Sequence, residues 1–251
     1  FGQIFLGFFY QNDSFFSNFA VKILKVEEMH VKTKAIVLNS LKYGESQIIV
    51  DLLTESVGRV SFMQRIPRSS RSGISKQLFQ PLTILDVEFD YRQSQKLQRL
   101  KNAAIAWPFC SIPFDAHKLG IALFMAEFVT YATRSEQQNR DQFMFVENSV
   151  MWLDTCVNSF ANFHIVFMLH MTRFVGFFPN MDGRQDCHYF DLRGGCFTPY
   201  APVHGDFLKP DEAGKIQLLM RLNYTTMRLL SLTRNERNRI VDVILYYYRL
   251  H

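Results

Sequence analysis

The chain has 251 residues, of which 48% are hydrophobic and 20% are charged. This composition is typical of a folded globular protein and excludes an intrinsically disordered one. No run reaches the ~18 uninterrupted apolar residues of a membrane-spanning helix, and four scattered cysteines do not make a disulfide framework in a chain of this size. We therefore expect reduced thiols in a cytoplasmic protein without membrane contact.

Residues 1–28 differ from the rest of the chain. They begin with Phe1 rather than methionine, are rich in Phe, Asn and Ser, and hold no cation before Lys22. A secretory signal would place its positive charges ahead of the apolar run, so we reject that interpretation. A regular pattern starts at Met29, and we expect residues 1–28 to be an upstream extension outside the functional protein.

The net charge of +5 is concentrated in one third of the chain. Residues 30–106 hold twelve Lys or Arg against six Asp or Glu, whereas residues 107–251 hold fourteen of each. The densest run is QRIPRSSRSGISK, residues 64–76, whose Pro, Ser and Gly favour an exposed loop. Lys and Arg side chains on an exposed loop are well placed to bind the phosphates of a nucleic acid, and binding is favoured because each neutralised phosphate releases a counterion. Because the positive charge is concentrated in one region, we favour a nucleic-acid binding surface over the alternative of a loop that is only solvated.

Residues 29–107 alternate with a period of two, which is typical of strands. The clearest case is Val87, Phe89 and Tyr91, which alternate with acids. Five short strands with a basic loop between the third and fourth suit a closed barrel of the OB kind, and an SH3-like barrel stays an alternative. The other strands are expected at residues 35–38, 46–53, 60–63 and 97–105.

Residues 108–251 predict an α-helical domain, so the fold class is α+β. Thr233 followed by Glu236 is a capping-box signature for a final helix through Leu250. Residues 178–208 contain three Pro and four Gly, which predicts a long irregular insertion. Other helices are expected at residues 115–133, 141–157 and 160–175 and from residue 211. The first of them is expected to pack through Leu119, Ala122, Leu123, Ala126 and Val129.

The barrel segments supply the candidate DNA-binding residues. Aromatic side chains can stack on bases of any sequence, and Tyr43 and Phe62 are the candidates for this role. Phe89 alternates with acids and is expected in the core. The cations that we expect to contact phosphates are Lys32, Lys34, Arg65, Arg68, Arg71, Lys76, Arg92, Lys96 and Arg99.

Motifs of catalysis and metal binding are absent from the sequence. There is no Gly-rich phosphate loop, no HExxH zinc motif and no GxSxG nucleophile elbow, so an enzyme is not expected. The one group with metal character is Cys187-His188 with Cys196 and His204. Zinc sites usually draw paired ligands from each arm, so an ordinary loop is the favoured interpretation.

Several segments resemble proteins of the RecO family, in the same order along the chain. The stretch KTKAIVLNSLKYGESQIIVDLLTESVGRVSFM (residues 32–63) is similar to their opening strands, and LFQPLTILDVEF (78–89) to their fourth. Three further segments resemble the C-terminal domain of these proteins: RFVGFFPN (173–180), YFDLRGGCF (189–197) and NYTTMRLLSLTRNERNRIVDVILYYYRLH (223–251). The resemblance is to the Bacteroidetes branch of the family.

The resemblance implies an OB-fold domain joined to a helical domain that carries a zinc-finger-like insertion. It also implies a repair protein of the RecF recombination pathway that binds single- and double-stranded DNA and anneals complementary strands. The implied partners are RecR, the C-terminal tail of the single-stranded DNA-binding protein and, indirectly, RecA. An acidic tail would need an apolar pocket with a cation at its rim, for which Arg173, Arg221 and Arg228 are candidates.

The sequence departs from this family in two places. Some relatives hold zinc through four cysteines in the region corresponding to residues 178–197, but this chain has only Cys187 and Cys196, so no metal cofactor is expected. Relatives usually continue past the position of His251, so we expect a truncated C-terminus. Two other function classes stay open: an OB-fold RNA-binding module, and a helical interaction adaptor whose barrel is only structural.

Overall fold

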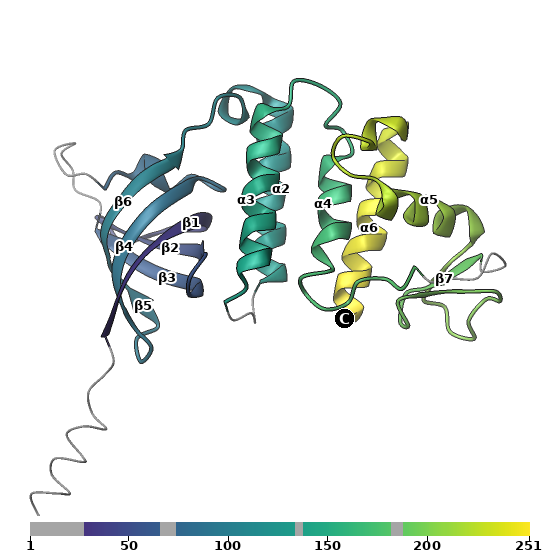
Figure 1. The fold of residues 1–251 in the computed structure, drawn as a ribbon, viewed down its shortest axis with the longest axis horizontal. Helices are drawn as coiled ribbons and strands as arrows, with labels where there is room; N and C mark the ends of the chain where they lie inside the picture. Colours follow the sequence, from purple (N-terminus) through teal and green to yellow (C-terminus); the bar gives the residue numbers. More distant parts are fainter. Residues whose placement is uncertain (1–27, 66–73, 134–137, 182–187) are drawn as a thin grey trace, which may run out of the picture.

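The computed structural model describes residues 28–65, 74–133, 138–181 and 188–251. A curled sheet forms the first part of the chain, and helices form the second (Figure 1). The helices α2 and α3 lie beside the sheet, and α4, α6 and α5 follow on the far side of them. The expected α+β class, with strands before helices, is confirmed.

The sheet closes because its two edges belong to one stretch of chain. Its strand order is β5-β3-β2-β1-β4-β6, with β5 parallel to β3 and β6 antiparallel to β4. Only Arg99 separates β5 from β6, so the single strand predicted over 97–105 is in fact broken there, and the sheet curls into a barrel. The strands are β1 (Glu28–Tyr43), β2 (Gln47–Thr54), β3 (Gly58–Arg65), β4 (Ile84–Arg92), β5 (Leu97–Gln98) and β6 (Leu100–Trp107).

Alternation along the strands fills the barrel interior. Val87 and Phe89 of β4 are buried, as their period-two spacing from the acids predicted. The rings of Phe62 and Phe89 meet edge to face at 4.9 Å in the centre of this core. Each strand thereby leaves its other face for solvent or for the helices.

The described residues of the second part form five α-helices. Asp115 caps the first by accepting from the backbone N–H groups of His117 and Lys118, and Thr233 and Glu236 form the predicted capping box at the last. None of the described helices is long and apolar enough to cross a membrane. The helices are α2 (Ala116–Ala132), α3 (Arg140–Thr155), α4 (Phe163–Met171), α5 (Pro210–Arg221) and α6 (Arg234–Leu250).

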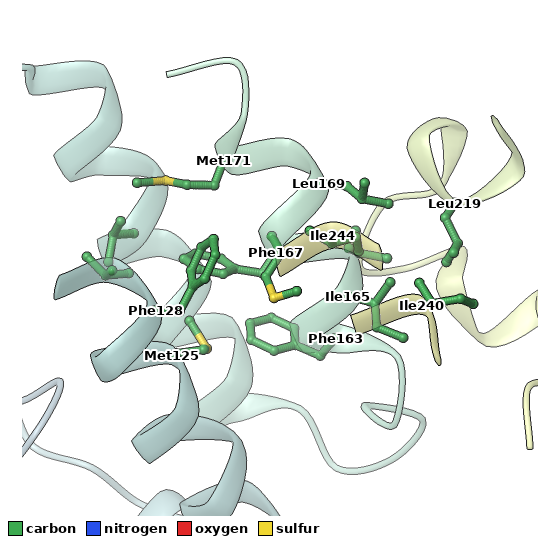
Figure 2. Packing of buried hydrophobic residues seen from close by; sticks show 14 of the residues in the cluster. Met125, Phe128, Phe163, Ile165, Phe167, Leu169, Met171, Leu219, Ile240 and Ile244 are labelled. Atoms are coloured by element: carbon green, nitrogen blue, oxygen red, sulfur yellow. The ribbon is translucent and has the colours of Figure 1, made fainter. Parts of the chain in front are cut away.

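Helix α4 is central to the helical core, as its apolar sequence predicted. Figure 2 shows Phe163 and Phe167 of α4 packed toward Met125 and Phe128 of α2. The helix is shorter than the predicted 160–175 and ends at Met171. Helix α2 packs differently from the prediction, because Leu119 and Leu123 are exposed. Its sequence is apolar on all sides, so spacing alone did not identify the buried face.

One apolar core joins the barrel to the helices. Polar bridges reinforce this junction: Lys34 lies 2.7 Å from the buried Glu147, and Arg59 donates to the carbonyl oxygen of Thr130 at the end of α2. Because these contacts link residues far apart in sequence, they hold the barrel in one orientation. The barrel residues that belong to the helical core are Ile36, Leu38, Leu53, Leu82 and Ile84.

The connection from β6 to α2 is anchored by a buried carboxylate. Asp154, at the end of α3, accepts hydrogen bonds from the backbone N–H groups of Cys110, Ser111 and Ile112. Burial acts to raise the pKa of Asp154, but these N–H donors outweigh it and hold the pKa at about 2. The carboxylate is therefore ionised and fixes the chain between the two domains.

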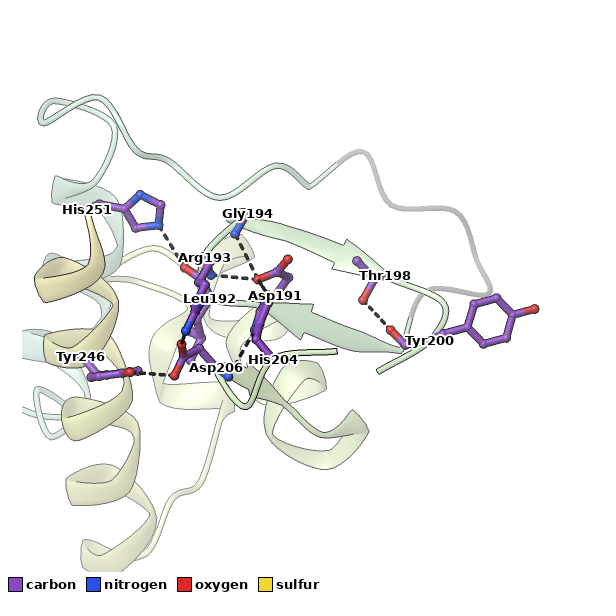
Figure 3. A network of polar contacts seen from close by, with 10 residues as sticks. All are labelled: Asp191, Leu192, Arg193, Gly194, Thr198, Tyr200, His204, Asp206, Tyr246 and His251. Atoms are coloured by element: carbon purple, nitrogen blue, oxygen red, sulfur yellow. Dashed lines mark hydrogen bonds and ion pairs between the residues drawn. The ribbon is translucent and has the colours of Figure 1, made fainter. Parts of the chain in front are cut away.

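The insertion predicted to be irregular contains a small antiparallel sheet. Its strands are ordered β8-β7-β9, with β7 at Tyr189–Asp191, β8 at Cys196–Thr198 and β9 at Phe207–Leu208. Figure 3 shows how α6 holds this sheet: Tyr246 donates to Asp206, which also pairs with Arg193.

Candidate nucleic-acid interface

A groove of about 480 Å³ lies where β3 ends and the β4–β5 turn begins. Its apolar lining comes from β3, β5 and β6, and its cations come from the end of β4, the link between β5 and β6, and the start of β6. We call this site the basic groove. It is lined by Met63, Asp90, Arg92, Gln95, Leu97, Gln98, Arg99, Leu100 and Lys101.

A buried amide fixes the turn that carries the groove's cations. Gln98 is 2% exposed, and its Nε2 donates to the carbonyl oxygens of Arg92 and Gln95 at 2.9 and 2.7 Å. Its Oε1 accepts from the N–H of Arg92. Because both ends of the turn are tied to one side chain, Arg92, Lys96 and Arg99 project from a preformed loop.

The strand register extends this surface beyond the groove. Met63 and Arg65 are two residues apart on β3 and share its outer face, roughly 7 Å from each other. Arg65 is opposite Gln47 of β2, which is opposite Tyr43 of β1. Tyr43 is 54% exposed, so it is available to stack at the same end of the barrel as Arg65.

Four predicted cations of the barrel have no acid partner within the described part of the chain: Arg65, Lys76, Lys96 and Arg99. All four are exposed. Cations without such partners can neutralise phosphates without first breaking an ion pair. Arg68 and Arg71 lie outside the described residues.

Lys32 and Lys34 lie instead on the outer face shared by β1 and β4, which we call the charge ladder. On this face Lys32 is opposite Glu88 and His30 is opposite Asp90. Lys32 pairs with Glu88 at 3.6 Å, and His30 lies 3.1 Å from both Glu88 and Asp90. Lys32 of the charge ladder is thus paired with an acid one strand away.

Lys34 is committed to the contact between the domains. A hydrogen bond to Glu147 raises the pKa of Lys34 against the effect of burial. Glu147 is buried, so withdrawing the lysine to reach a phosphate would leave an uncompensated carboxylate. Lys34 therefore has a structural role at this junction, and its contact with phosphate stays a prediction.

The prediction for Phe62 was wrong. Its ring is 0% exposed and packs on Phe89, so it cannot stack on a base. The signal was present in the sequence, because Phe62 alternates in phase with Val60, another inward residue. Met63 and Leu97, which line the basic groove, were not among the predicted residues.

A second hollow, of about 580 Å³, lies between α2 and α6. The three arginines predicted for a tail pocket are not part of it: Arg173 stacks on Phe178 at 4.4 Å, and Arg221 and Arg228 are exposed. We call this hollow the helical groove. It is lined by Phe124, Glu127, Phe128, Tyr131, Ala132, Leu245, Tyr248 and Arg249.

Three members of the group with metal character, His188, Cys196 and His204, lie within the described part of the insertion. Asp191 accepts from the N–H groups of Arg193 and Gly194 and lies 3.3 Å from His204. Oδ1 of Asp191 is therefore engaged with protein groups, and Cys187 lies outside the described residues. No group of three or more potential ligands is found among the residues that the structure describes.

Comparison with known proteins covers both parts of the chain. The family model "Recombination protein O N terminal" matches residues 29–109, and "Recombination protein O C terminal" matches residues 113–251. The DNA repair protein RecO of Phocaeicola vulgatus is 45% identical over 220 residues, which cover 88% of this chain and 91% of that protein. RecO of Bacteroides fragilis is 46% identical over 221 residues, with the same coverage.

A more distant relative matches over the same length. The DNA repair protein RecO of Azobacteroides pseudotrichonymphae is 33% identical over 223 residues, or 89% of this chain and 92% of that protein. The barrel is accordingly the OB-fold domain of this family. The chain belongs to the RecO family of DNA repair proteins.

Proposed function

We propose that this RecO-family chain binds single- and double-stranded DNA, anneals complementary strands and helps load RecA on DNA coated with single-stranded DNA-binding protein. The observation that carries the proposal is the basic groove, together with the exposed cations around it that have no acid partner among the described residues. We propose that it acts in the RecF recombination pathway, in the cytoplasm, as a binding protein without catalysis or a metal.

The proposed mechanism is electrostatic. Annealing requires two polyanions to approach one another, and the cations around the basic groove lower that repulsion. Each phosphate neutralised on a single strand contributes ~0.7 to the slope of log affinity against log salt. Arg65, Lys96 and Arg99 are the described residues best placed for these contacts, and Tyr43 can stack on a base beside Arg65.

The partners proposed are RecR and the C-terminal tail of the single-stranded DNA-binding protein. The helical groove suits an acidic chain end with apolar side chains, since its walls are largely aromatic and Arg249 supplies a cation. Arg249 takes the role for which Arg173, Arg221 and Arg228 were predicted. Replacement of Arg249 with Glu should weaken a labelled tail peptide without changing affinity for naked DNA.

The direct test is annealing of complementary strands coated with single-stranded DNA-binding protein, with and without the chain. We expect faster annealing with the chain, and a lower rate when Arg65, Lys96 and Arg99 are replaced with Ala. Preference for RNA in a competition with DNA oligonucleotides would favour the RNA-binding alternative. Partner binding without salt-dependent DNA affinity would favour the adaptor alternative.

A further inference from the structure

Helix α2 exposes an apolar face, unlike α3 and α6. The exposed positions of α3 and α6 are mostly polar or charged, such as Arg140, Asp141 and Asn148 on α3. On α2, in contrast, Leu119 and Leu123 are 41% and 49% exposed. A helix that is apolar on all sides is usually buried on all sides. The exposed face of α2 therefore lacks a covering element within the described part of the chain.

The exposed positions of α2 follow the spacing of a helix-pairing seam. Four of them are separated by four, three and four residues along the helix. With this spacing, side chains of one helix pack between those of another in a coiled coil. We call these residues the α2 seam. They are Ala116, Gly120, Leu123 and Glu127.

The shape of the α2 seam is complementary to a second copy of itself. In an antiparallel pair centred on the middle of the seam, Gly120 is opposite Leu123 of the second copy, and Ala116 is opposite Glu127. Gly120 leaves room for the leucine, because no heavy atom lies within 4 Å of the position that a Cβ atom would take. A twofold axis makes both contacts twice, so each large side chain is opposite a small one.

The charges of α2 favour the same arrangement. Glu127 is the one acid of α2 and has no ion-pair partner among the described residues. A parallel pair would bring the two Glu127 side chains together, whereas an antiparallel pair separates them by roughly 16 Å along the helix axis. It also brings each carboxylate to the end of the second helix that carries His117. The His117 side chain is 89% exposed and lies 3.6 Å from Asp115.

We propose that the α2 seam is a homodimer interface, in which α2 of one copy packs antiparallel against α2 of a second copy. The dimer carries two basic grooves, so it can hold two complementary strands at once. This consequence rests on the proposed annealing of DNA, whereas the dimer itself does not. Leu123 and Gly120 are the residues to test, because neither lines the basic groove or the helical groove.

Sedimentation equilibrium of the full chain without DNA measures the association. We expect a monomer–dimer equilibrium in the original chain. Leu123→Glu should raise the dissociation constant of the dimer at least about tenfold, because it places an unpaired charge in the seam. Gly120→Leu should raise it by a similar factor, because the added side chain fills the space that accepts Leu123 of the second copy.

Met144→Glu is the matched control, since Met144 is 38% exposed but lies on α3. It should associate like the original chain, and thermal unfolding should show all variants folded. An original chain that stays monomeric up to about 100 µM would overturn the dimer and leave the proposed DNA binding intact. So would association that neither seam variant weakens. A dimer that binds no DNA would instead overturn the proposed function alone.

Discussion

The charge ladder and the basic groove lie on the same barrel and carry similar cations, but the ladder pairs its lysines with acids, whereas several exposed cations around the groove have no acid partner within the described residues. On the ladder, Lys32 has Glu88 as its neighbour across the sheet and Lys34 has Glu147 across the domain junction. Around the groove, Lys96 and Arg99 have no acid partner within the described residues. This difference shows that the number of Lys and Arg residues in a sequence overstates the positive charge available to a ligand. Ion pairs within the fold decide which of these cations can still bind an anion.

The largest loss of stability is expected from removal of the carboxylate of Asp154. Asp154→Ala should lower the free energy of unfolding by about 3–5 kcal/mol, because three backbone N–H groups lose the buried acceptor that they share. Urea unfolding followed by circular dichroism measures this. Asp242→Ala, an exposed site on α6, is the control and should cost under about 0.5 kcal/mol. Similar losses in the two variants would contradict the anchoring role of Asp154.

Substitutions around the basic groove should lower the affinity for DNA and leave the stability of the fold unchanged. Replacing Arg65, Lys96 and Arg99 together with Ala should weaken single-stranded DNA binding roughly 30- to 100-fold near physiological salt, through three lost phosphate contacts. Fluorescence anisotropy measures the affinity, and urea unfolding should show little change, because all three side chains are exposed. A loss of stability with unchanged affinity would reverse the contrast between groove and ladder.

Protonation of His164, on the central helix α4, would place a positive charge inside the helical core. Burial, aided by Arg237, lowers the pKa of His164 to about 4, from an ordinary 6.5. The unfolded chain therefore binds the proton first, and stability present above pH 6.5 is lost as the pH falls toward 4. Between pH 6.5 and 5 this one group should cost about 2 kcal/mol. His164→Asn should reduce the change in the free energy of unfolding between pH 6.5 and 5. An unchanged pH dependence in this variant would contradict the role of His164.

A ladder variant should lose stability but keep its affinity for DNA, in contrast to the groove variant. Lys34→Met should lower the free energy of unfolding by about 1–2 kcal/mol, because the carboxylate of Glu147 stays buried without its partner. Affinity for single-stranded DNA should change less than about twofold, as expected where no phosphate contact is lost. The double variant with Glu147→Gln should recover part of the stability. An affinity loss as large as that of the groove variant would show that Lys34 contacts DNA after all.

Local signals in the sequence predicted local structure well. Asp115 caps its helix and Thr233 with Glu236 forms the capping box, because each needs only neighbours a few residues away. The inward phase of Phe89 was also readable from its alternation with acids. The same rule applied to Val60 would have placed Phe62 in the core.

Non-local features could not be predicted in this way. The pairing of Lys34 with Glu147 spans 113 residues and depends on how the barrel docks. Gln98 looks like an ordinary polar residue until the turn folds around its amide. The groove arises because the break at Arg99 brings β5 beside β3, and alternation reports no such break.

The most direct test of the contrast between the two surfaces is the salt dependence of single-stranded DNA affinity. Log affinity against log salt should be measured for the original chain, for Lys32→Ala on the ladder and for the triple variant of Arg65, Lys96 and Arg99. We predict that the ladder variant keeps the original slope, while the triple variant loses about 2 from it, at ~0.7 per phosphate. Equal slopes in the original chain and the triple variant, or a change confined to Lys32→Ala, would contradict the basic groove as the DNA-binding surface.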